Sequence, residues 1–314
     1  MSVFVTADAH GNIIDKLSYR RNPEVRQLTE DDVLVICGDI GLGWFGADKE
    51  YKYLLDFLAA KSFKVVLVRG NHDNTDVIRN HSVPSTGNRD TVKLITGTLC
   101  NPVYGDKIYD SIFWVPDSAV LNLCGHRSLV ISGASSSDIW NLVSPHEKER
   151  IKRLKREHQF YRVIGKSWWP DENINIPYAF SLLNDYFRTT GTYYAYVENL
   201  PFVGDGHKRV GYFDYVFTHD CPAFMCDVYA RPGDLGRLRP TESQDFLELI
   251  KDHINYRYFI HGHMHTFIRY AVTEDDYGKH EVVCLYKDIF KLPDNPRDSN
   301  FQDWEFICQT AQLV

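Results

Sequence analysis

Five short apolar runs in this sequence are each followed at once by side chains that can bind a metal ion. These side chains are Asp8 and His10, Asp39, Asn71 and His72, His219, and His263 and His265. A lone histidine is usually structural, but packing does not explain five runs that end in this way. The donors are nitrogen and oxygen without a thiolate, which favours Mn, Fe, Zn or Ni over a structural zinc–cysteine site. This many donors exceed the needs of one ion, and they suit two ions about 4 Å apart that share a bridging carboxylate.

The apolar runs are the predicted strands that position these donors. Residues 2–6, 33–37 and 65–68 are strands, and an amphipathic helix at about 47–61 precedes the third. This β–α–β–α–β order predicts a parallel sheet covered by helices. Ligands bind at the carboxyl ends of such strands. The i, i+2 spacing of Asp8 and His10, repeated in His263 and His265, directs each pair to one side of an extended segment.

The rest of the chain predicts a second sheet. Strands are expected at 91–94, 108–115, 119–123 and 128–131, as an antiparallel meander, and alternating patterns at 267–272 and 281–286 are expected to complete this sheet. Strands at 214–218 and 256–260 carry the later histidines. A helix is expected at 241–253, with Thr241 as its N-cap and Gln244 at N3.

A long basic helix is predicted at 144–164. Ser144, Pro145 and Glu147 fit a capping box with proline at N1, and Gly165 is a natural stop. Its first half, 148–156, carries six basic residues, which form either a solvated face or a basic arm for a polyanionic substrate. Another helix is expected at 178–188. We interpret 140–212 as a helical and aromatic elaboration inserted in one domain spanning 1–314.

Composition limits the remaining classes of function. The net charge of −7 does not support a general binder of nucleic acid or membranes, and no apolar run approaches the roughly 20 residues of a membrane span. The seven scattered cysteines indicate reduced thiols in a cytoplasmic protein. Arginine suits bidentate phosphate contacts, so the loop at 227–240 is a candidate substrate loop or a solvated one, through Arg231, Arg237 and Arg239.

Together these features resemble the calcineurin-like metallophosphoesterase family. The matching motifs are Asp8-Ala9-His10, Gly38-Asp39, Gly70-Asn71-His72-Asp73, Thr218-His219-Asp220 and Gly262-His263-Met264-His265. The resemblance implies an α/β fold, a four-layer α-β-β-α sandwich of two mixed sheets. It also implies a dinuclear metal-dependent phosphoesterase.

The resemblance further implies a role for each donor. Asp8, His10 and His265 would hold one metal, Asn71, His219 and His263 the other, and Asp39 would bridge the two. A metal-bridging hydroxide would attack phosphorus in line, and His72 would assist the leaving oxygen, so no phospho-enzyme is expected.

One departure from the family pattern affects His72. The protein Ser/Thr phosphatase branch has a carboxylate and an arginine where this chain has Leu42 and Gly43. Another group must therefore orient His72, and Asp138 is a candidate, with Asp73 as a further supporting carboxylate. Residues 133–138 and 168–172 resemble a bacterial or phage branch of small metallophosphoesterases, in which the basic helix would be an insertion.

Three functions remain open from the sequence. The acidic net charge favours a phosphatase acting on phosphomonoesters. The basic helix and the arginine loop keep a phosphodiesterase or nuclease as the alternative, with nucleic acid only as a substrate. A non-catalytic, metal-stabilised interaction scaffold is the third, although such a protein would be expected to lose ligands that this chain retains.

Overall fold

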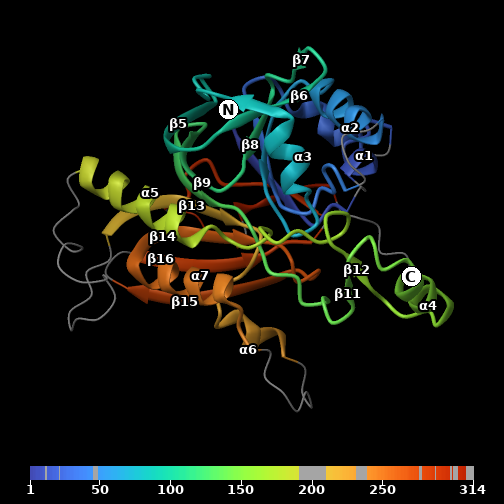
Figure 1. Cartoon of the computed structure of the whole chain (residues 1–314). Helices are drawn as coiled ribbons and strands as arrows, with labels where there is room; N and C mark the ends of the chain where they lie inside the picture. Colours follow the sequence, from blue (N-terminus) through green and yellow to red (C-terminus); the bar gives the residue numbers. More distant parts are fainter. Residues whose placement is uncertain are drawn as a thin grey trace.

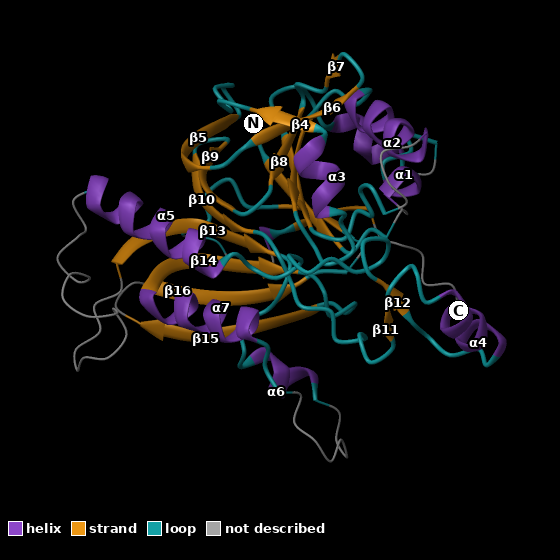
Figure 2. Ribbon diagram, in the orientation of Figure 1, coloured by secondary structure: helices purple, strands orange, loops and turns teal. Residues whose placement is uncertain are grey.

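The computed structural model shows two large mixed sheets with helices on their outer faces (Figure 1, Figure 2). It describes residues 1–10, 13–20, 22–44, 49–190, 210–230, 239–275, 278–286, 288–297, 299 and 303–308. Among the described residues, no helix is both long enough and apolar enough to cross a membrane.

The first sheet has nine strands, with its N-terminal strands at the centre. Its main path runs β18-β17-β1-β2-β3-β8-β6-β4, and β7 pairs with β6. The strands are β1 (Val3–Ala7), β2 (Val33–Cys37), β3 (Lys64–Val68), β4 (Ser82–Pro84), β6 (Cys100–Tyr104), β7 (Lys107–Ile108), β8 (Ile112–Val115), β17 (Ile289–Lys291) and β18 (Glu305–Cys308). The strands β1, β2, β3 and β8 are parallel and buried, as their β-branched sequences favour.

The second sheet has seven strands in the order β15-β16-β14-β13-β10-β9-β5. They are β5 (Val92–Gly97), β9 (Ser118–Leu123), β10 (His126–Ile131), β13 (Val210–Thr218), β14 (Ile254–His261), β15 (Ile268–Asp275) and β16 (Gly278–Cys284). The strands β10, β13, β14 and β16 are parallel, so β13 and β14 end at the same edge of this sheet.

Three apolar cores bind the layers together. One lies between the sheets and joins residues such as Val35 of β2 with Phe217 of β13. A second lies between the first sheet and α2, and a third lies between the second sheet, α5 and α7. The helices are α1 (Ile13–Lys16), α2 (Lys49–Ala59), α3 (Thr75–Asn80), α4 (Lys148–Arg156), α5 (Ile176–Thr189), α6 (Met225–Tyr229) and α7 (Glu242–His253), with a 3-10 turn at Pro23–Gln27. This is the four-layer α-β-β-α sandwich.

The meander at 91–131 differs from the prediction. The expected strand at 108–115 is two strands, and β8 belongs to the first sheet, parallel to β3, rather than to the second. All four residues of β8 are buried, which suits a central parallel strand better than a meander. The strands β17 and β18, which complete the first sheet beside β1, were not predicted.

The helix predicted at 144–164 is wrong in its length and its cap. The helix α4 ends at Arg156, because His158 adopts a φ of 52° and the Gln159 N–H turns back to the Leu154 carbonyl. Leu154 is the one buried residue of α4, so packing does little to prolong it. The N-cap is Glu147, without a side-chain cap hydrogen bond.

After this turn the chain returns as a short strand. The strand β12 (Arg162–Val163) pairs in parallel with β11 (Leu142–Val143). The helix α4 therefore lies in the connection between the two strands of a small ribbon at the edge of the molecule (Figure 1). By contrast, α7 has the predicted capping box of Thr241 and Gln244. The expected elaboration at 140–212 lies partly outside the described residues, which omit 191–209.

Candidate metal centre

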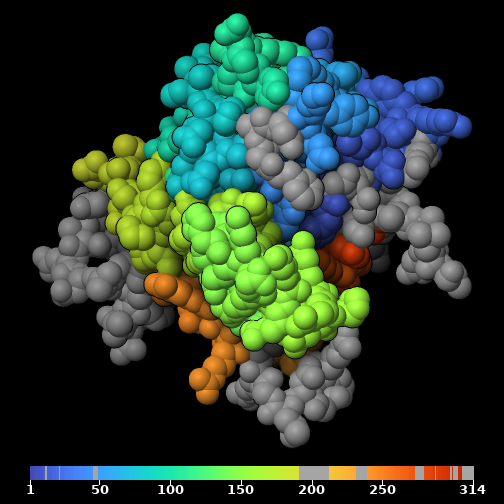
Figure 3. All heavy atoms as spheres, turned by 45° about the vertical axis from the view of Figure 1, so that its right-hand side comes forward, coloured from blue at the N-terminus to red at the C-terminus, as the bar shows by residue number. Residues whose placement is uncertain are grey.

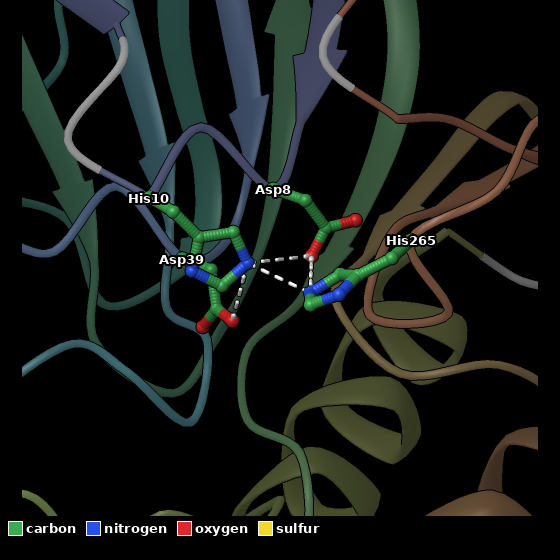
Figure 4. Close-up of side chains that lie close together, drawn as sticks. All are labelled: Asp8, His10, Asp39 and His265. Carbon is green, nitrogen blue, oxygen red and sulfur yellow. Dashed lines mark hydrogen bonds and ion pairs between the residues drawn. The ribbon is translucent and has the colours of Figure 1, made fainter.

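The loops that follow β1, β2 and β14 bring four donors to one point. Asp8, His10, Asp39 and His265 direct their ring nitrogens and carboxylate oxygens toward one another (Figure 4). His10 Nε2 lies 2.7 Å from His265 Nε2, 3.9 Å from Asp8 Oδ1 and 3.7 Å from Asp39 Oδ2. His265 Nε2 lies 3.7 Å from Asp8 Oδ1.

A second group of donors shares Asp39 with the first. Asp39, His219 and His263 offer ligand atoms within 4.8 Å of one another. His219 Nε2 lies 3.2 Å from Asp39 Oδ1 and 3.2 Å from the amide oxygen of Asn71. The Asp39 carboxylate therefore has one oxygen facing each group, the arrangement that a bridging ligand requires.

A buried carboxylate oxygen in these groups indicates that a cation fits here. Asp39 Oδ2 faces His10 and accepts no hydrogen bond from the described residues, although the side chain is almost fully buried. Burying an anionic oxygen without a partner is costly, and a metal ion is the usual compensation. The set of nitrogen and oxygen donors suits a divalent transition metal.

The electrostatics of the two groups are strongly perturbed. Burial raises the pKa of Asp8 to about 7, and the neighbouring Asp39 adds to this while His219 opposes it. Burial acts to raise the pKa of Asp39 as well, but the charge and hydrogen bond of His219 hold it below its usual range. Burial acts to lower the pKa of His219, and Asp39 raises it to about 10. Binding of metal would release protons from these groups.

A chain of hydrogen bonds fixes the orientation of the Asn71 amide. Its Nδ2 donates to Ser136 Oγ at 3.0 Å, and Ser136 Oγ and N–H donate to the two oxygens of Glu172 at 2.9 and 2.6 Å. The Asn71 oxygen is thereby left facing His219. Burial raises the pKa of Glu172 to about 7, against its hydrogen bonds from Ser136. Sequence reasoning did not single out Glu172 or Ser136.

Asp73 supports the loop that carries Asp39. Its carboxylate accepts the backbone N–H groups of Asp39, Gly41, Leu42 and Gly70 at 2.9–3.1 Å. It thus ties the loop after β2 to the loop after β3. Gly70 lies so close to Asp39 that a Cβ atom at position 70 would overlap Asp39 Oδ1.

His72 lies at the edge of the donor groups. Its backbone N–H donates to Asp39 Oδ1 at 2.8 Å, and its ring stacks on Trp44 with centroids 4.7 Å apart. Its Nε2 lies 3.9 Å from Asp39 Oδ2 and 3.0 Å from Arg162 Nη2. Arginine can only donate, so His72 Nε2 accepts this hydrogen bond and the ring is neutral in this state.

Arg162 is a further residue at this site that sequence reasoning missed. Its side chain is 3% exposed, it donates to both oxygens of Asp138 at 3.0 and 2.7 Å, and it donates to the Ser167 carbonyl at 2.9 Å. Asp138, which the sequence offered as a candidate for orienting His72, therefore reaches His72 through Arg162. Nothing local distinguishes Arg162 from the other basic residues of the segment.

Of the three arginines in the predicted substrate loop, the structure describes Arg239. Arg231 and Arg237 lie outside the described residues, and Arg239 is exposed just before α7. Within the part of the chain that the structure describes, Arg239 makes no hydrogen bond or ion pair with the donor groups.

Comparison with known proteins identifies the family of this chain. The calcineurin-like phosphoesterase family matches residues 1–267, and the chain belongs to this family. It is therefore a metal-dependent phosphoric ester hydrolase, and the family implies a dinuclear site for divalent ions and a phosphoester substrate.

Solved structures that match include two hydrolases. A phosphopantetheinyl hydrolase from Mycobacterium tuberculosis is 14% identical, with a TM-score of 0.38, and the match covers 100% of this chain and 98% of that chain. A dimetal phosphatase from Danio rerio is 13% identical, with a TM-score of 0.40, and the match covers 93% and 95%. No curated protein matches the chain.

Proposed function

We propose that this protein hydrolyses phosphate monoesters with two divalent metal ions. Asp8, His10, Asp39 and His265 would hold one ion, and Asn71, His219 and His263 would complete the other beside Asp39. When bound, such ions activate water and neutralise charge on the phosphoryl oxygens. The observation that carries this proposal is the buried Asp39, which belongs to both donor groups and has an oxygen without a hydrogen bond from the described residues.

The chain's own residues position the leaving group. His72 is held by its N–H bond to Asp39 and by the Trp44 ring, so its Nε2 faces the donor groups. A bound phosphoryl group offers Arg162 a charged acceptor in place of His72 Nε2. This exchange leaves His72 Nε2 free to take up a proton from solvent, which it would then deliver to the leaving oxygen.

The preference for monoesters rests on charge. A monoester dianion carries one more negative charge than a diester, and the buried Arg162 adds a fixed positive charge beside the metal groups. Its fork of donors matches phosphoryl oxygens. We further propose manganese as the first ion to test, since all the donors are nitrogen and oxygen. We also propose a cytoplasmic location, because the cysteines are scattered and odd in number.

The direct test compares p-nitrophenyl phosphate with bis-p-nitrophenyl phosphate, using stripped protein given Mn²⁺, Ni²⁺ or Zn²⁺. We expect metal-dependent turnover that favours the monoester. Asp39→Asn should abolish it, and Asp76→Asn, an exposed carboxylate on α3, should not change it. Absence of turnover with every metal, despite two bound ions, would favour the scaffold.

A phosphodiesterase is the second candidate. The observation that favours it is the segment around α4, where the exposed Phe160 ring lies 5.5 Å from the Arg162 guanidinium and several cations of α4 form no ion pair with the described residues. A faster reaction of the bis ester in the same assay would support this candidate over the monoesterase.

A further inference from the structure

The segment 139–164, which we call the insert, exposes an unusual amount of apolar surface. Of the ten large hydrophobic side chains exposed among the described residues, four belong to it: Ile139, Trp140, Phe160 and Ile164. Trp140 is 70% exposed and Phe160 is 51% exposed, and their ring centroids lie 6.5 Å apart. Figure 3 shows this part of the chain in yellow-green, covering a broad part of one face. Exposed rings of this kind mark binding sites more often than single exposed residues do.

The insert is also basic in an acidic chain. It holds seven Lys and Arg residues against three Glu, whereas the whole chain has a net charge of −7. Two of its cations are neutralised locally, because Arg150 pairs with Glu147 and Lys152 pairs with Glu149. Four more on α4 form no ion pair with the described residues: Lys148, Arg153, Lys155 and Arg156. This local excess of positive charge favours a polyanionic ligand.

The rings are connected to the metal centre through Arg162. The Arg162 guanidinium lies 5.5 Å from the Phe160 ring centroid and 5.5 Å from that of Trp44, and its Nη2 lies 3.0 Å from His72. Asn141 donates to the Phe160 carbonyl at 2.9 Å, which holds the Trp140 segment beside the Phe160 segment. A ligand seated on the two rings would therefore extend directly to His72.

We propose that the insert binds single-stranded nucleic acid and presents it to the metal centre. Bases would stack on Trp140 and Phe160, and phosphates would lie near the unpaired cations of α4. Exposed aromatic rings interleaved with cations are the combination that binds single strands without reading sequence. The inference rests on the proposed function and names its substrate class, a strand whose terminal monoester or internal diester reaches the metals.

The test measures binding apart from turnover. A fluorescein-labelled single-stranded oligonucleotide is titrated, by fluorescence anisotropy, with full-length Asp39→Asn protein and with the same protein carrying Trp140→Ala or Phe160→Ala. Stacking is worth about 1–3 kcal/mol per base, so each ring substitution should weaken binding about 5- to 150-fold. Tyr53→Ala is the matched control, because Tyr53 is 59% exposed on α2, outside the insert.

Charge is tested separately by replacing the four unpaired cations with Gln. Each phosphate of a single strand that a cation neutralises contributes about 0.7 to the slope of log affinity against log salt, so this slope should become shallower by about 3. Thermal melts establish that each variant is folded. Unchanged affinity in the folded ring variants would overturn the inference. The inference would also be overturned if polyglutamate displaced the labelled oligonucleotide as well as unlabelled oligonucleotide does, which would indicate an acidic protein partner.

Failure of the inference and failure of the proposed function are distinguishable. Metal-dependent turnover of p-nitrophenyl phosphate without oligonucleotide binding would overturn the inference and leave the phosphoesterase. Binding that depends on the rings, in a protein without turnover of any ester, would support the insert as a nucleic-acid site and remove the proposed catalysis.

Discussion

Replacement of Arg162 is the sharpest test of how this site works. Arg162 is buried and makes three hydrogen bonds with side chains, two to Asp138 and one to His72. If one of its donors turns to the phosphoryl group, removing that hydrogen bond should cost about 1.5–3 kcal/mol in transition-state binding. We therefore expect Arg162→Gln to lower kcat/KM for p-nitrophenyl phosphate about 10- to 150-fold.

The pattern across variants separates phosphate binding from folding. Arg162→Lys keeps the charge but not the fork that spans both Asp138 oxygens, so it should retain more phosphate affinity than Arg162→Gln. Asp138→Asn leaves the guanidinium in place but removes its charged partner, and should cost only a few fold. Arg188→Gln, an exposed arginine on α5, is the matched control.

Two readouts accompany the rates. Inorganic phosphate should inhibit competitively, and its inhibition constant should rise in Arg162→Gln by as much as kcat/KM falls. Guanidinium ions in solution should restore part of the activity of Arg162→Ala. The reasoning is refuted if Arg162→Gln is folded and keeps both the wild-type kcat/KM and the wild-type inhibition by phosphate.

Four further outcomes follow from the site. Mn²⁺ at 100 times its Kd should stabilise the stripped protein in thermal melts by about 2.7 kcal/mol for each ion bound; equal stabilisation of Asp39→Asn would contradict the bridging role. Gly70→Ala should reduce metal affinity in calorimetric titration, because the new methyl overlaps the Asp39 carboxylate; unchanged affinity would contradict this packing. Asp73→Asn should destabilise the fold by about 1–3 kcal/mol in urea, since one amide oxygen cannot accept four N–H groups; a destabilisation no larger than that of Asp76→Asn would refute it. Burial raises the pKa of Glu172 from 4.5 to about 7, so the stripped protein should lose about 3 kcal/mol of stability as the pH rises from 4.5 through 7. Glu172→Gln should remove that part of the pH dependence. A stability profile of this variant identical to that of the wild type would be evidence against the prediction.

Local sequence predicted the strands well, and the side chains that it offered as candidate donors lie together in the structure. An apolar, β-branched run that stops at a carboxylate or imidazole carries its whole signal within a few residues, as at Val33–Cys37 and Asp39. The parallel order follows from the helices between such runs. The donors converge because the parallel strands of each sheet end at one edge, and the structure brings the two edges together. The side chains that meet there are Asp8, His10, Asp39, Asn71, His219, His263 and His265.

The missed features depend on contacts between distant segments. The strand β8 was placed in the wrong sheet because its partner, β3, lies over forty residues earlier in the chain. Glu172 reaches Ser136 because the buried Arg69 holds the carbonyls of Glu172 and Asn173 at 2.6 and 2.9 Å. Arg162 lies in a short strand because the chain leaves the helix before it, with His158 in a left-handed conformation, and a periodic basic sequence gives no sign of that turn.

The backbone at the metal centre has a consequence for selection. Seven described residues other than glycine have positive φ, and five of these are Asp8, His10, Asp39, His263 and His265. A left-handed residue with a side chain costs about 1–2 kcal/mol, which glycine would avoid while providing no ligand atom. Stability and activity therefore demand opposite residues at these five positions. A library of variants selected only for heat resistance should accumulate glycine at these positions. A lineage that is no longer selected for catalysis should lose the ligand side chains there before its core residues change.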